Sequence, residues 1–429
     1  MLGQNKDFNF ISSRRMIMVI ILTYLGLAAL AGLPYLLCGN FSPLDAFFEG
    51  MSTVTLTGCT TVLLPESLPS WVLVWRSVLQ WVCGCFTILL FIMVLPKIFH
   101  NSMCLFNGDL GDYHNWRVLP DGRSAVRNFA LLYAGFTVLV FCGLIFLDVP
   151  VWEGFHYACG VVSTAGFSMQ NGAVLQELGN GAKIFMAITM LLAGGNYLFY
   201  CTLFKQQIGG KKADEEFSFY IGFALMAAVA VIFNMWYVGY ERAALTDVFC
   251  QVASFASTTG YMFTDCNTWP VFSRFALACF CFTGACAGST AGGLKMVRCL
   301  ILLKQFNWDV NAVFHPKMLE GVPFNGKRIS ASVCYAISFY FFAHLLMVCL
   351  VALGLALNDC SSVEAFFTAG AALANSGGIM SSTALGCNFA NFTWAGKAFL
   401  VLGMLVGRLE IFIPLALFLP EFWHKDEKW

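Results

Sequence analysis

Eight long stretches of this chain contain almost no charged residues, and they constrain its fold more than any other feature. Most are close to the ~20 residues that a helix needs to cross the hydrocarbon core of a bilayer. Only 11% of the 429 residues are charged, whereas a soluble domain has about 25%. The sequence therefore predicts an all-α polytopic membrane protein with eight transmembrane helices. The stretches are residues 16–38, 78–96, 125–147, 184–204, 217–238, 271–286, 329–357 and 396–419.

The distribution of positive charge predicts how the chain lies in the membrane. If the first stretch starts on the cytoplasmic side, 18 of the 24 Lys and Arg residues fall in cytoplasmic segments and five fall outside. Cytoplasmic loops of membrane proteins carry such an excess. We therefore expect both termini in the cytoplasm. The formal net charge is zero, so it gives no argument about acidic or basic partners. We expect no nucleic-acid binding.

The connections between stretches one and two, three and four, five and six, and seven and eight repeat a pattern. Each is apolar and contains a glycine with a carboxylate 13 residues upstream and a phenylalanine 11 residues upstream. The chain is therefore predicted to repeat one unit four times, in which a short re-entrant helix lies between two spans. The glycines are Gly58, Gly166, Gly260 and Gly377; the carboxylates are Asp45, Glu153, Asp247 and Glu364; the phenylalanines are Phe47, Phe155, Phe249 and Phe366. The four repeats are assigned to residues 1–110, 111–212, 213–325 and 326–429.

Each connection is typical of a short helix that enters the membrane without crossing it. Ser42 precedes Asp45, and Ser361 precedes Glu364, at the spacing of a helix cap. About 13 helical residues span only roughly 20 Å. At membrane depth, the non-helical backbone that follows is tolerated only inside protein or beside a water-filled cavity. Four such breaks around one axis predict a ring of backbone carbonyls that can replace the hydration shell of potassium.

Simpler interpretations of these residues stay open. The carboxylates can be helix caps or can attract cations to an outer vestibule. The phenylalanines are most simply packing residues, and the glycines can be tight turns. The 18 cysteines lie mostly in apolar stretches without a CxxC pair, which favours buried thiols over metal binding or disulfides.

Several ordered motifs resemble the Trk/Ktr/HKT superfamily of potassium transporters, and most closely the bacterial Trk-type pore subunit. They cover nearly the whole chain, and AGSTAGGLKMVR is the most specific of them. The number of spans departs from many Trk-type subunits, which carry two further spans before the first repeat, and matches the Ktr type. The motifs are LDAFFEGMSTVTLTG (44–58), WRSVLQWVCG (75–84), STAGFS (163–168), STTGY (257–261), AGSTAGGLKMVR (287–298) and GRLEIF (407–412).

The resemblance implies potassium uptake through a selectivity filter, to which each repeat gives one strand that contains a glycine. In this family a serine at the first filter glycine accompanies sodium transport, so Gly58 favours potassium. A sodium or sodium-coupled potassium transporter of the same architecture is the alternative. The implied filter residues are Leu56, Thr57 and Gly58; Thr164, Ala165 and Gly166; Thr258, Thr259 and Gly260; and Asn375, Ser376 and Gly377.

The resemblance also implies a gate below the filter. Its first part is an intramembrane loop in TGACAGSTAGGLK (283–295), which continues the sixth stretch. There Gly288, Ser289, Thr290, Gly292 and Gly293 interrupt apolar sequence. A kink that lets helices pack closely is the alternative. The second part is Arg408, a charge within the last stretch that is costly unless it faces water or a partner. Glu410 lies two positions on and should face another way. Arg408 is then a barrier to cations, or the partner of a carboxylate on another helix.

The family further implies a homodimer in the bacterial inner membrane, in contact with lipid and with a cytosolic ring of nucleotide-binding regulatory domains. We expect no cofactor, and no metal ion other than potassium as substrate. An alternating-access carrier is a less favoured interpretation, because its repeats are usually inverted. An intramembrane hydrolase is disfavoured because no HExxH or similar motif occurs, so we do not expect an enzyme.

Overall fold

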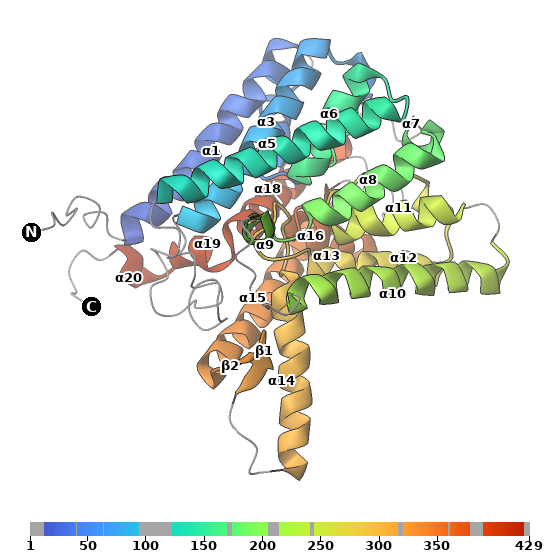
Figure 1. Ribbon diagram of the computed structural model, residues 1–429. Coiled ribbons are helices and arrows are strands. Elements are labelled where there is room, and N and C mark those ends of the chain that lie inside the picture. Colours follow the sequence, from blue (N-terminus) through green and yellow to red (C-terminus); the bar gives the residue numbers. More distant parts are fainter. Residues whose placement is uncertain are drawn as a thin grey trace, which may run out of the picture.

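A computed structural model describes residues 13–39, 41–62, 64–93, 122–169, 174–204, 214–240, 244–315, 321–358, 361–377 and 389–423. Helices make up almost all the regular structure in these ranges (Figure 1). Within these ranges, five helices are long and apolar enough to cross a membrane: α1 (Ser13–Leu37), α3 (Ser70–Met93), α5 (Gly122–Phe146), α10 (Glu215–Val238) and α15 (Ala331–Ala356). Five of the expected spans are therefore single long helices, and the total of eight spans stays a prediction.

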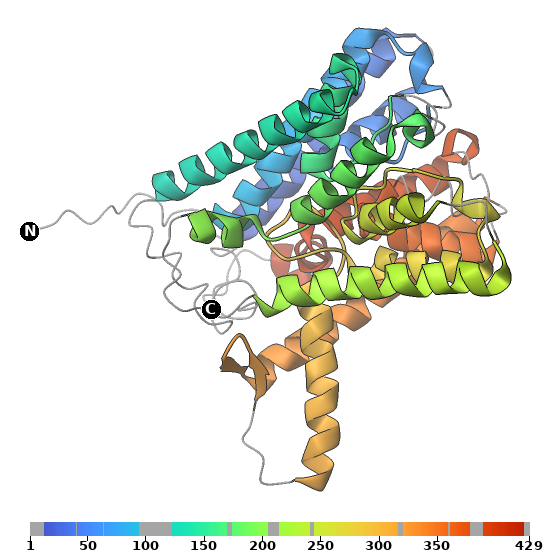
Figure 2. The same cartoon turned by 45° about the vertical axis from the view of Figure 1, so that its right-hand side comes forward.

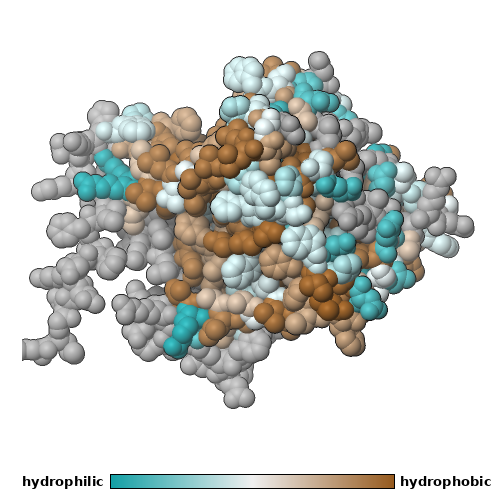
Figure 3. Space-filling model, turned by 90° about the horizontal axis from the view of Figure 1, so that it is seen from above, coloured by the Kyte–Doolittle hydropathy of each residue, from teal (hydrophilic) through white to brown (hydrophobic). Residues whose placement is uncertain are grey.

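The outer faces of these helices are apolar, as contact with lipid requires. On α1 and α5, Leu22, Leu30, Leu131 and Val138 are each more than half exposed. Figure 3 views the molecule from above and shows apolar residues over the middle of that face, with hydrophilic residues gathered towards its edges. Apolar side chains at such exposure would be unfavourable in water. These faces thus fit a chain embedded in a bilayer.

Three expected spans are broken in the structure. Residues 184–204 divide between α8 (Asn180–Ala193) and α9 (Tyr197–Phe204). Residues 396–419 divide between α18 (Trp394–Leu409) and α19 (Phe412–Ala416), and α20 (Pro420–Trp423) follows them. The prediction of continuous helices was wrong for these two, because Gly194 and Gly195 interrupt the first and Glu410, with φ of 65°, ends α18. In the sixth span a break was expected: α12 (Val271–Ala278) and α13 (Phe280–Thr283) precede a non-helical segment that leads to α14 (Met296–Phe314).

Each apolar connection contains the expected short helix: α2 (Pro43–Val54), α6 (Val151–Ser163), α11 (Leu245–Ala256) and α16 (Ser362–Leu373). The caps predicted from the sequence are present. The Ser42 hydroxyl accepts a hydrogen bond from the backbone of Asp45, and Ser361 and Glu364 form a reciprocal capping box. We call these four elements the pore helices.

The pore helices close a ring through the helices of neighbouring repeats. α6 packs on α3, α11 on α8, α16 on α13, and α2 on α18. Two of these contacts carry an ion pair at the N-terminal end of the pore helix: Lys183 lies 2.8 Å from Asp247, and Lys397 lies 2.5 Å from Asp45. These two carboxylates therefore join neighbouring repeats.

One part of the structure was not anticipated. A small antiparallel hairpin of β1 (Val322–Phe324) and β2 (Lys327–Ile329) follows α14, which projects away from the other helices (Figures 1 and 2). The prediction of a purely helical chain was wrong here. Asn325 and Gly326 have φ of 46° and 79°, and Asn-Gly is the sequence that the tight two-residue turn of a hairpin favours. Short helical turns complete the fold: η1 (Pro65–Ser67), α7 (Val174–Glu177), η3 (Cys266–Thr268) and η5 (Phe389–Asn391).

Candidate functional site

The four pore helices end with the same backbone reversal. In α2, the amide of Leu56 donates to the carbonyl of Thr53, and the amide of Thr57 donates to the carbonyl of Ser52. This pair of bonds is the Schellman motif, which requires a left-handed residue. The same two bonds recur after the other three pore helices. In all four the left-handed residue lies two positions before the glycine: Leu56 (φ 61°), Thr164 (φ 53°), Thr258 (φ 58°) and Asn375 (φ 52°).

The short segments from each left-handed residue to its glycine lie against one another. We call them the glycine strands, and they are residues 56–58, 164–166, 258–260 and 375–377. A Cβ atom placed on Gly58 would lie 2.3 Å from the carbonyl oxygen of Ala165, and one on Gly166 would lie 1.8 Å from that of Thr259. The amide of Gly377 donates to the carbonyl of Thr57 at 2.6 Å. The structure thus brings together strands from all four repeats, with carbonyl oxygens of one strand against the glycine of the next. Backbone oxygens gathered in this way can coordinate a cation.

Side chains at the left-handed positions reach beyond their own strands. Thr164 donates from Oγ1 to Oγ1 of Thr290 at 3.0 Å. The Nδ2 atom of Asn375 donates to Oγ1 of Thr57 and to the carbonyl of Met404, both at 3.0 Å. A glycine at position 164 or 375 would relieve the backbone but would lose these contacts, which gives a physical reason for a side chain at these two positions.

The break in the sixth span lies directly against two of the strands. Residues 284–295 form this segment, the intramembrane loop, and Gly284, Gly288 and Gly293 have positive φ. A Cβ atom on Gly292 would lie 2.4 Å from the carbonyl oxygen of Ala374 in the fourth repeat, while Thr290 contacts Thr164 in the second. The loop therefore bridges opposite members of the ring. A kink for helix packing does not account for these contacts with the strands.

Arg408 binds the same loop. It lies in the last turn of α18 and is only 2% exposed. Its Nη1 donates to the carbonyl of Thr290 at 2.6 Å, and its Nε donates to Oγ1 of Thr87 at 3.3 Å. No carboxylate pairs with Arg408 within the described part of the chain. The alternative interpretation, in which Arg408 pairs with a carboxylate on another helix, is therefore not found among the described residues.

Glu410 has a different partner, as the sequence indicated, although the reason differs. The helix ends at Leu409, and the carboxylate of Glu410 lies 2.7 Å from the guanidinium of Arg298, which stacks 3.8 Å from the ring of Tyr340. Lys295 donates to the carbonyl of Ala291 within the loop. We did not assign Arg298 or Lys295 from the sequence, although both belong to the AGSTAGGLKMVR motif.

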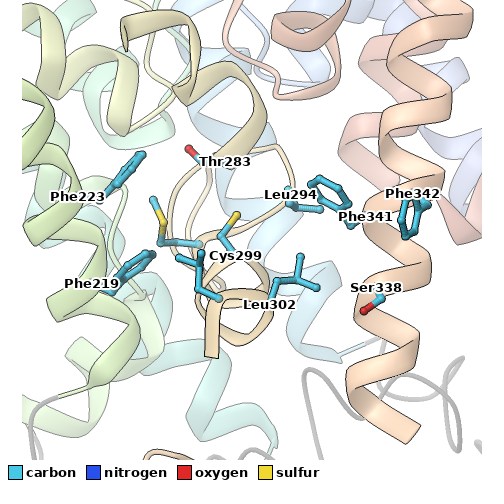
Figure 4. Close-up of a pocket in the computed structure, with 11 residues that line it drawn as sticks. Phe219, Phe223, Thr283, Leu294, Cys299, Leu302, Ser338, Phe341 and Phe342 are labelled. Carbon is cyan, nitrogen blue, oxygen red and sulfur yellow. The ribbon is translucent and has the colours of Figure 1, made fainter. Parts of the chain in front are cut away.

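A cavity of about 450 Å³ lies beside the last residues of the loop. Figure 4 shows Phe219 and Phe223 of α10 on one side, Phe341 and Phe342 of α15 on the other, and Leu294 of the loop facing the space between them. The cavity is lined almost wholly by apolar groups, so it is unsuited to a hydrated ion. It gives the end of the loop free space on one side.

Comparisons with known proteins place the chain in a family. Residues 10–425 match the family model of TrkH, described as a cation transport protein. The chain belongs to the TrkH family. It is a multi-pass membrane protein of a transporter family and not an enzyme, and the resemblance found in the sequence is confirmed.

Named relatives agree with this family. The TrkH potassium uptake protein of the Trk system from Salmonella typhimurium is 30% identical over 425 residues, which cover 97% of this chain and 87% of that protein. The TrkG protein of the Trk system from Escherichia coli is 27% identical and covers 90% and 80% of the two chains. The crystal structure of the potassium transporter TrkH from Vibrio parahaemolyticus superposes with a TM-score of 0.86 at 23% identity, over 98% and 88% of the chains. The fold of this TrkH-family chain is thus shared with a solved transporter.

The contact between Gly166 and Thr259 leads to a prediction. Gly166→Ala should reduce the yield of folded protein and its melting temperature, because a new methyl group would overlap the carbonyl oxygen of Thr259 and φ at Gly166 is 58°. Gly222→Ala is the matched control, since nothing lies within 4 Å of a Cβ atom there. Thermal unfolding followed by size-exclusion chromatography checks this. Equal melting temperatures for the two variants would contradict the close approach of strands two and three.

Proposed function

We propose that the chain takes up potassium through a selectivity filter formed by the four glycine strands. The observation that carries this proposal is the recurrence of one backbone reversal in four repeats, followed by strands whose carbonyl oxygens and glycines meet. Such a set of carbonyl oxygens can take the place of the water molecules that surround a potassium ion in solution. The carbonyl ends of four helices point to the same region and add partial negative charge there. Potassium is the substrate, and the chain needs no cofactor of its own.

Potassium is favoured over the sodium alternative for two reasons. Position 58 is a glycine, so its carbonyl and those around it can approach an ion without a side chain between them. The relatives reported above are named as potassium uptake proteins. The four strands differ in sequence, so the carbonyl geometry is only approximately fourfold and the selectivity is moderate.

The intramembrane loop and Arg408 form the gate in this proposal. The loop lies against strands two and four, and Arg408 holds its middle through the carbonyl of Thr290. Cations that leave the filter would meet both the loop and a buried positive charge. Opening requires the loop to move, and the cavity beside Leu294 supplies free space for that movement.

The chain works as a homodimer in the bacterial inner membrane, with both termini in the cytoplasm. A row of exposed apolar residues along α14, formed by Leu303, Phe306, Val310 and Val313, supports contact with a second copy. The relatives are named as parts of a Trk system, which supports a separate regulatory partner. That partner is a cytosolic ring of nucleotide-binding domains, which would act on the gate from the cytoplasmic side.

The filter assignment is tested at Gly58. Gly58→Ser should lower the ratio of potassium to sodium flux by about tenfold, which corresponds to about 1.4 kcal/mol. The reason is that φ at Gly58 is 82° and an added Cβ atom would lie 2.3 Å from the carbonyl oxygen of Ala165. Paired flux measurements in proteoliposomes give this ratio. A folded variant with the wild-type ratio would remove Gly58 from the filter.

The gate assignment is tested at Arg408. Arg408→Gln should raise potassium or rubidium uptake about tenfold or more, because two unit charges ~4 Å apart repel by about 4 kcal/mol at an effective dielectric of ~20. The ion selectivity should hardly change, since the strands are untouched. Arg408→Lys keeps the charge and is the control, with uptake expected near wild type. Uptake by folded Arg408→Gln protein at or below the wild-type rate would defeat the gate assignment.

A further inference from the structure

A buried carboxylate on the first pore helix binds the segment that follows Gly58. Glu49 lies on α2, nine residues before Gly58, and its side chain has no exposed surface. One oxygen, Oε1, accepts hydrogen bonds from Oγ1 of Thr60 at 2.9 Å, from the amide of Thr61 at 2.5 Å and from Oγ1 of Thr61 at 2.9 Å. All three donors lie two or three residues after the glycine. The side chain thus joins the pore helix to the segment that follows its own glycine strand.

In the third repeat, a glutamine side chain makes the equivalent contact with the segment that follows the glycine. Gln251 lies nine residues before Gly260 and is also fully buried. Its Oε1 accepts from the amide of Phe263 at 3.0 Å, and its Nε2 donates to the carbonyl of Tyr261 at 3.4 Å. Phe263 is the third residue after its glycine, as Thr61 is after Gly58. The position and the amide that is bound are therefore equivalent in the two repeats.

In the second repeat, an arginine side chain from a neighbouring helix binds the segment that follows the glycine. Arg76 of α3 is 2% exposed, and its Nη2 donates to the carbonyl of Ser168, two residues after Gly166, at 2.6 Å. Its guanidinium also lies 4.7 Å from the ring centroid of Phe167. Arg76 also lies close enough to Glu49 to interact with it electrostatically.

Burial of these groups is expensive unless each is bonded, and apolar side chains would fill the same space at lower cost. In three of the four repeats their hydrogen bonds hold the segment that directly follows the glycine. We propose that Glu49, Gln251 and Arg76 are positioning residues that fix the outer half of the filter, and so set its preference between potassium and sodium. This inference rests on the proposed function of the strands. None of the three side chains needs to touch the ion.

The first test compares two substitutions at one position. Glu49→Ala removes the acceptor and should lower the ratio of potassium to sodium flux about fivefold, equivalent to about 1 kcal/mol. Glu49→Gln keeps an acceptor oxygen, as Gln251 does in the third repeat, and should stay within about twofold of wild type. Glu66→Ala, which removes an exposed carboxylate from the same connection, is the control for loss of charge. Folding is checked by melting temperature and size-exclusion chromatography.

A second pair of variants keeps the test decisive if Glu49→Ala does not fold. Replacing Thr60 and Thr61 by valine removes two of the donors but preserves side-chain shape, and Gln251→Ala tests the third repeat. Both should lower the flux ratio while total potassium flux remains measurable. A wild-type ratio in folded Glu49→Ala or in the valine variant would overturn the inference, as would equal losses in Glu49→Gln and Glu49→Ala. If the wild-type protein passed no potassium, the proposed function itself would fail.

Discussion

The left-handed residue at the end of each pore helix is the constraint on which the rest of the site depends. Residues other than glycine pay about 1–2 kcal/mol for this conformation, and here four of them adopt it at equivalent positions. The reversal ends the helix inside the protein and satisfies its last carbonyls through the Schellman bonds. It also turns the following strand back towards its neighbours. Two residues later, at Gly58, Gly166 and Gly377, a carbonyl oxygen of another strand leaves no room for a Cβ atom.

The loop, Arg408 and the strands form one connected set of contacts. Thr290 is central to it, because its hydroxyl meets Thr164 and its carbonyl accepts from Arg408. A movement of the loop would therefore act directly on the second glycine strand, through the hydrogen bond between Thr290 and Thr164. Arg298 is neutralised by Glu410, whereas Arg408 is bound only by neutral oxygen atoms among the described residues. The unbalanced charge thus lies next to the loop.

Patterns that depend on local sequence were predicted well. The pore helices, their caps and their glycines follow from fixed offsets, because capping and helix length are set by neighbouring residues. The breaks in the fourth and eighth spans did not follow, since residues 184–204 and 396–419 are apolar on both sides of the break. The contact of Arg408 with Thr290 joins segments that are 118 residues apart in the sequence, so no local spacing reveals it. The Asn325–Gly326 turn was visible in the sequence and was missed.

The central claim is that four strands from one chain form a filter that prefers potassium. Flux through the purified protein in liposomes, compared under gradients of potassium, rubidium, sodium and lithium, tests it most directly. We expect potassium and rubidium to pass at similar rates and faster than sodium and lithium, because carbonyl oxygens replace the hydration shell of the larger ions more readily. Equal rates for all four ions, or faster flux of sodium, would contradict the account.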